Sequence, residues 1–118
     1  MTIIDDYLSL TLQYKKEYGT KTLLLMQVGS FFECYALLKT ANLQIFNESD
    51  DSPESIYYGS DIQNFSDIND LVISKKNVSH RSTPVVMAGF GLPQLEKYIR
   101  RLQENDYTIV VYTQDTNT

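Results

Sequence analysis

Apolar positions near the start of the chain recur at intervals of three and four residues. This spacing is typical of a helix with one buried face, and it predicts a helix that ends near Tyr18, before Gly19. The positions on the apolar face are Ile4, Tyr7, Leu8, Thr11 and Tyr14. Residues 21–28 follow as a dense apolar run without polar alternation, which predicts a central strand covered on both faces.

Short apolar runs separated by polar segments continue through the rest of the chain. They predict further strands at residues 32–38, 43–46, 56–58, 71–73, 84–90 and 107–112. Two more helices are predicted, one capped by Ser60 or Asp61 and the other opened by Leu92 and Pro93. The acidic residues 47–55 and the basic residues 74–83 are predicted surface loops. These elements indicate an α/β (α+β) fold, in which about three helices pack against one mixed sheet of about five to six strands.

The length of 118 residues fits one domain that spans residues 1–118. Cys34 is the only cysteine, so an intrachain disulfide is impossible and a reducing intracellular compartment is expected. No apolar run approaches the length of a membrane-spanning helix, and we therefore expect no membrane partner.

Two aromatics and a carboxylate, Phe31, Phe32 and Glu33, follow the predicted central strand and Gly29. Their place at a strand end or turn predicts that they are exposed. Strand alternation puts Phe31 and Glu33 on one face and Phe32 on the other, which makes Phe32 the predicted core aromatic. An aromatic beside a carboxylate suits insertion into a DNA base stack, with the carboxylate accepting a hydrogen bond from a base edge. Taken alone, however, strand aromatics are more commonly core residues.

The formal net charge of −5 opposes DNA binding, because phosphate contacts supply most of the affinity for DNA. The charges are unevenly distributed: residues 47–70 contain seven acids and no base, whereas residues 71–101 contain six bases and one acid. One segment can therefore face phosphates while the other faces away. We expect weak DNA binding by this chain alone, with further phosphate contacts from other domains or a partner subunit. We also predict that the chain is a piece of a longer protein.

Four segments of the chain, in order, resemble the N-terminal domain (domain I) of the MutS family of DNA mismatch-repair proteins. The first contains the Phe-X-Glu motif of that domain, which falls here on Phe31 and Glu33. The four segments are Thr22-Leu-Leu-Leu-Met-Gln-Val-Gly-Ser-Phe-Phe-Glu-Cys-Tyr35, Asp70-Leu-Val-Ile-Ser-Lys-Lys76, Pro84-Val-Val-Met-Ala-Gly-Phe90 and Val110-Val-Tyr-Thr-Gln114. The helix through Tyr98 and Leu102 resembles the family's helix at the same place, so the resemblance covers most of the chain.

The resemblance implies a domain that recognises mismatched double-stranded DNA and catalyses no reaction. It assigns Phe31 as the wedge that stacks on a mispaired base and Glu33 as the acid that forms a hydrogen bond with a base. The other residues expected to contact DNA are Lys75, Lys76, His80 and Arg81, which would hold the flanking backbone, and Met87, a second apolar contact.

The remaining parts of a MutS-like protein would lie outside this chain. No G-x-x-x-x-G-K-(S/T) phosphate-binding loop occurs in the sequence, so we expect no cofactor or metal in this domain. The resemblance implies that ATP and Mg bind in a separate ATPase domain of the parent protein. It also implies that the parent works as a dimer formed through other domains.

Several positions depart from the family pattern. Ser30 replaces the commoner acid before the wedge, and Phe32 replaces a frequent Tyr. Phe90 and Gly91 follow Met-Ala-Gly, where the family usually has a Pro two positions on, and residues 36–60 form a longer stretch than the usual linker. These departures favour a divergent branch of the family, such as those of viral or organellar genomes.

Two other functions are compatible with the same residues. Glu33, Asp61 and Lys75 would suit a metal-dependent nuclease, since acids and a lysine can bind magnesium and activate water. Their spacing, however, matches no nuclease motif. Alternatively, the chain is a protein-interaction module in which Phe31 anchors in a pocket of the partner, and this predicts no preference for mismatched DNA.

Overall fold

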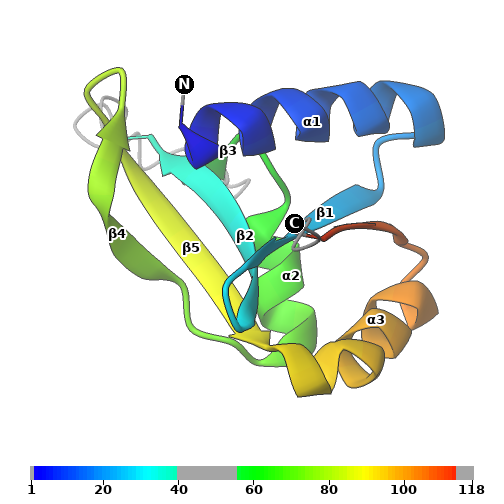
Figure 1. Ribbon diagram of the computed structural model, residues 1–118. Helices are drawn as coiled ribbons and strands as arrows, with labels where there is room; N and C mark the ends of the chain where they lie inside the picture. The colour runs from blue at the N-terminus through cyan, green and yellow to red at the C-terminus, as the bar shows by residue number, and fades with distance from the viewer. Residues whose placement is uncertain (1, 40–55, 114–118) are drawn as a thin grey trace, which may run out of the picture.

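Figure 1 shows the computed structural model of the chain, which describes residues 2–39 and 56–113. The helices are α1 (Ile3–Tyr18), α2 (Ile62–Asn69) and α3 (Leu95–Glu104), and a 3-10 turn at Leu92–Gln94 precedes α3. The strands are β1 (Thr22–Val28), β2 (Phe31–Leu38), β3 (Tyr57–Tyr58), β4 (Ser74–His80), β5 (Thr83–Gly91) and β6 (Thr108–Tyr112). The predicted strand at residues 43–46 and the predicted loop at residues 47–55 lie outside the described residues.

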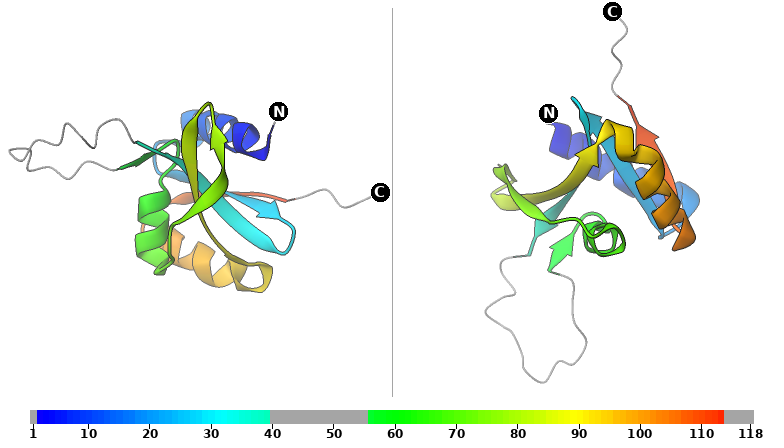
Figure 2. Two further views of the ribbon diagram at one scale, coloured as in Figure 1. Left: turned by 90° about the vertical axis from the view of Figure 1, so that its left-hand side faces the viewer. Right: turned by 90° about the horizontal axis from the view of Figure 1, so that it is seen from below.

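One mixed sheet organises the described part of the chain. Its strand order is β4-β5-β2-β1-β6, with the short β3 paired to the end of β2. The β1–β6 pair is parallel and the others are antiparallel. Helix α1 lies on one side of the sheet, and α2 and α3 lie on the other (Figures 1 and 2). This six-stranded sheet with three helices confirms the predicted fold class.

Aromatic contacts fix the two helix layers to the sheet. On the α1 side, the Tyr7 ring meets the Tyr35 ring edge-on, with 5.2 Å between centroids. On the other side, Phe65 of α2 and Tyr98 of α3 both pack against Phe90 of β5, at 6.3 and 4.5 Å. All five side chains are buried, so the sheet has a core on each face.

Strands β1 and β2 pair only near their shared hairpin and then separate. Their register runs from Val28 opposite Phe31 to Met26 opposite Glu33, after which β1 continues beside β6 and β2 beside β5. The Tyr7 hydroxyl fills the gap between them, where it donates a hydrogen bond of 2.8 Å to the Leu24 carbonyl oxygen. A side chain of α1 therefore satisfies a backbone carbonyl at the point where the hydrogen bonds between β1 and β2 stop.

The predicted strand at residues 71–73 and the predicted loop at residues 74–83 are both wrong. The strand begins later, at Ser74, and a two-residue turn formed by Arg81 and Ser82 connects it to β5, with His80 opposite Thr83. Both turn residues have a positive φ, 51° and 69°. Hydrophobic alternation is weak in β4 because it is an edge strand whose side chains are mostly exposed. The turn contains no glycine to mark it.

A candidate nucleic-acid interface

Phe31 stands at the start of β2, directly after a tight hairpin turn. Gly29 adopts a φ of 61° in that turn, and Val28 and Phe31 face each other across it. The Phe31 side chain is 52% exposed, whereas Phe32 is 4% exposed and packs 6.0 Å from the Phe90 ring. The predictions that Phe31 is exposed and that Phe32 belongs to the core are confirmed. The expectation that Phe32 shares the exposed strand end is wrong.

Glu33 lies on the same face as Phe31 but is only 8% exposed, which also contradicts the prediction of an exposed carboxylate. Its neighbours across the sheet are Met26 of β1 and Gly89 of β5. Glu33 Oε1 accepts a hydrogen bond from the hydroxyl of Tyr35, two residues further along the same face. The carboxylate is thus held in the sheet surface instead of projecting from a loop.

Two glycines of β5 lie beside these residues, Gly89 opposite Glu33 and Gly91 opposite Phe31. A Cβ at Gly89 would lie 2.6 Å from the Phe32 carbonyl oxygen and 3.1 Å from Glu33 Cγ. At Gly91 a Cβ would meet only Pro93 Cδ, at 3.7 Å. Gly89 is therefore required for close packing, whereas Gly91 leaves open space next to the exposed ring.

Tyr112 is an exposed aromatic that was not among the predicted site residues. It lies at the end of β6, opposite Met26, which in turn lies opposite Glu33. These three residues form one row across the sheet, so their side chains share a face. Tyr112 is 44% exposed. Its alternation with Val110 was visible in the sequence, but its position near Glu33 depends on the pairing of β6 with β1.

Met87 and Lys76 lie on the same face. Met87 is half-buried and faces Tyr35 across the β2–β5 ladder. Lys76 extends from β4 over the Tyr35 ring, with 5.4 Å from its amino nitrogen to the ring centroid. We call this surface the Phe31 face. Its members are Phe31, Glu33, Lys76, Met87 and Tyr112.

The other three predicted DNA contacts lie elsewhere. Lys75 faces Val86, so its side chain lies on the opposite side of the sheet from Lys76. His80 Nδ1 is 2.9 Å from a carboxylate oxygen of Asp5 in α1. Arg81 lies in the turn at the Thr83 end of β5, whereas Phe31 lies opposite Gly91 at the other end. Thr83 and Gly91 are eight residues apart, which is about 26 Å along the strand. The structure therefore brings together only part of the predicted contact set.

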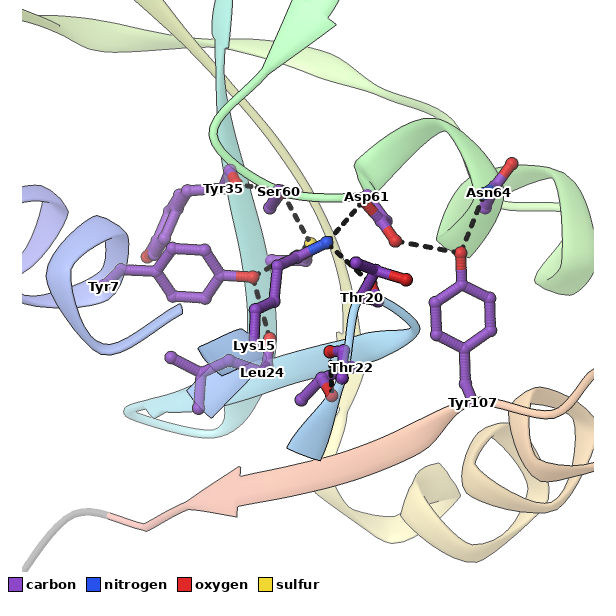
Figure 3. Close-up of polar contacts among 12 residues, drawn as sticks. Tyr7, Lys15, Thr20, Thr22, Leu24, Tyr35, Ser60, Asp61, Asn64 and Tyr107 are labelled. Atoms are coloured by element: carbon purple, nitrogen blue, oxygen red, sulfur yellow. Dashed lines mark hydrogen bonds and ion pairs between the residues drawn. The ribbon is translucent and has the colours of Figure 1, made fainter. Parts of the chain in front are cut away.

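The residues of the nuclease alternative do not converge. Asp61 precedes α2, where its carboxylate lies 2.9 Å from Lys15 Nζ and accepts a 3.0 Å hydrogen bond from the Tyr107 hydroxyl (Figure 3). Glu33 and Lys75 lie on opposite faces of the sheet. Within residues 2–39 and 56–113, no group of three or more His, Cys, Asp or Glu side chains is placed to hold a metal ion.

A groove of about 880 Å³ lies between α1, the segment before α2 and α2 itself. Leu12, Tyr58 and Gln63 line it, together with Lys15 and Asp61. The two charged groups bind each other there, and Lys15 Nζ also donates to the Thr20 carbonyl oxygen at 2.9 Å (Figure 3). The polar contacts join α1 to the residues just before β1 and α2, and they serve to hold these elements together.

No helix in the part of the chain that the structure describes is long and apolar enough to cross a membrane. Comparison of the chain with protein-family models and with curated proteins finds no match.

Proposed function

We propose that this chain is the mismatch-recognition domain of a MutS-like DNA-repair ATPase. One observation carries the proposal. Phe31 presents a half-exposed aromatic ring at the start of β2, and Glu33 lies on the same face two residues away. This is the arrangement that a Phe-X-Glu motif needs if the ring is to stack on a base while the carboxylate meets that base's edge.

The selectivity of such a site comes from the deformability of the DNA. A mispaired base stacks and pairs poorly, so unstacking and kinking the duplex there costs less than at a matched pair. Insertion of Phe31 would recover roughly 1–3 kcal/mol through stacking on the base. Glu33 adds a penalty wherever no base donor is available, because a desolvated carboxylate near phosphates is unfavourable. Phe31 and Glu33 therefore both add binding free energy at a mismatched site, and neither adds any at a matched site.

The rest of the Phe31 face supports a groove-binding surface. Tyr112 and Met87 add apolar contacts on either side of Glu33, and Lys76 supplies a positive charge on the same face. Because the net charge is −5, most phosphate contacts are assigned to other domains of a dimeric parent, where ATP and Mg also bind.

The test is the ratio of affinities for a mismatched and a matched duplex, both measured at the same low salt concentration. Because it is a ratio, the result does not depend on how weak the absolute affinity is. Phe31→Ala should reduce mismatch affinity roughly 5-fold to 150-fold and leave matched affinity unchanged. Tyr58→Ala is the matched control, since Tyr58 is 42% exposed but lies on β3. A wild-type chain without mismatch preference would contradict the proposal and favour the protein-interaction module.

A further inference from the structure

The side chain that contacts Glu33 is itself firmly held. Tyr35 is fully buried, although its hydroxyl reaches Glu33 Oε1 on the Phe31 face. Its ring meets the Tyr7 ring edge-on at 5.2 Å, and Lys76 Nζ lies 5.4 Å from its centroid. The position of the Tyr35 hydroxyl is therefore set by α1 and β4, and not only by the carboxylate that it contacts.

The Tyr35 hydroxyl can serve this carboxylate only as a donor. Burial raises the pKa of Tyr35, and the hydrogen bond to Glu33 raises it further, so the phenol keeps its proton. The donated hydrogen bond occupies Glu33 Oε1, so Oε2 is the oxygen that Tyr35 does not contact.

Gly89 limits the carboxylate from the other side. Glu33 lies against the β5 backbone at this glycine, where a Cβ would come within 3.1 Å of Glu33 Cγ. The side chain is thus confined between a flat glycine surface and a fixed hydroxyl. Such confinement reduces the number of rotamers and gives the free oxygen one preferred direction.

We propose that Tyr35 is a positioning residue that holds Glu33 through Oε1, leaves Oε2 to accept a hydrogen bond, and so biases the Phe31 face towards mispaired bases with a ring N–H donor. Thymine N3–H and guanine N1–H are such donors. Without the hydroxyl, a nearly buried carboxylate oxygen would lose its partner and the Glu33 side chain could adopt other rotamers. This inference rests on the proposed function.

The experiment compares affinities for duplexes with a G·T mispair, which offers ring N–H donors, and an A·A mispair, which offers ring acceptors. Both duplexes are compared at one fixed pH and salt concentration. The wild-type chain should prefer G·T. Tyr35→Phe should lower the G·T to A·A ratio about tenfold. Tyr107→Phe is the matched control, because its hydroxyl, on another buried tyrosine, contacts Asn64 and Asp61, and it should keep the wild-type ratio.

A second comparison separates positioning from a general structural effect. In a Glu33→Ala background, Tyr35→Phe should leave the ratio unchanged, because the group on which Tyr35 acts is gone. A wild-type ratio in Tyr35→Phe would overturn the inference. An equal loss with and without Glu33 would also overturn it.

The failure of the proposed function can be told apart from the failure of this inference. If the wild-type chain prefers no mismatch, the function is wrong, but the carboxyl carbon signal of Glu33 can still be compared between variants by NMR. Loss of the Tyr35 hydroxyl should shift this signal, because Oε1 loses its hydrogen bond. Identical carboxyl signals in the wild type and Tyr35→Phe would show that Tyr35 does not hold Glu33.

Discussion

Phe31 lies directly opposite Gly91 in the antiparallel β2–β5 ladder, so the neighbouring strand places no side chain beside the exposed ring. A base that stacks on Phe31 can therefore approach the β5 backbone closely. The same strand places Gly89 beside Glu33, two residues earlier. The two glycines of β5 thus shape the surface around both members of the Phe-X-Glu motif, although they lie far from it in the sequence.

Filling the space at Gly91 should impair DNA binding without unfolding the chain. Gly91 has a φ of −71°, which any residue can adopt, and a Cβ there meets only Pro93. Gly91→Leu should lower mismatch affinity about tenfold by crowding the stacking surface of Phe31. Gly91→Ala should bind nearly as the wild type does. Fluorescence anisotropy with labelled mismatched duplex measures both, and a wild-type affinity for Gly91→Leu would contradict the stacking geometry.

Gly89 should be far less tolerant of the same alanine substitution. A Cβ placed 2.6 Å from the Phe32 carbonyl oxygen forces the β2–β5 ladder apart, at a cost of about 1–3 kcal/mol. Urea unfolding should therefore show a clear loss of stability for Gly89→Ala. Gly91→Ala, two residues away on the same strand, should change the unfolding free energy by no more than about 0.5 kcal/mol. Equal losses for the two variants would mean that the close approach at Gly89 is incorrect.

The turn between β4 and β5 offers a stabilising change. Arg81 and Ser82 both occupy left-handed backbone conformations, which Asn and Gly adopt more readily. The double variant R81N/S82G should raise the unfolding free energy by about 1 kcal/mol. It should leave mismatch preference unchanged, since the turn is remote from Phe31. If R81N/S82G loses the preference for mismatched DNA, then Arg81 does contact DNA.

The buried thiol of Cys34 gives a prediction about alkaline pH. Burial raises the pKa of Cys34 from 9.0 to about 11, so the folded chain keeps a proton that the unfolded chain releases. This contribution to stability is complete below pH 9 and is lost as the pH rises towards 11. The unfolding free energy should therefore decline over this interval more steeply for the wild type than for Cys34→Ala. Parallel declines would show that the thiol does not contribute.

The sequence was informative where local periodicity decides the structure. The spacing of Ile4, Tyr7 and Thr11 predicts α1, and all three are buried. Alternation alone placed Phe31 and Phe32 on opposite faces. It failed for β4, because an edge strand that reads Ser-Lys-Lys-Asn-Val-Ser-His has no apolar face to reveal it.

The missed features of the Phe31 face depend on contacts between distant segments. Glu33 is buried because β5 covers one side of it and β1 the other. Tyr112 joins the face only because β6 pairs in parallel with β1, across the whole intervening chain. Strand pairing of this kind is not encoded in any short window of sequence. The Tyr35–Glu33 contact, by contrast, joins residues two apart on one strand face.

Mismatch recognition by this chain requires that Phe31 enters the DNA. A 2-aminopurine placed next to a G·T mispair becomes more fluorescent when its base step is unstacked. Saturating wild-type chain should raise this fluorescence in the mismatched duplex but not in the matched one, and saturating Phe31→Ala should raise it in neither. The same increase with wild type and Phe31→Ala would contradict insertion by Phe31 and, with it, mismatch recognition through this residue.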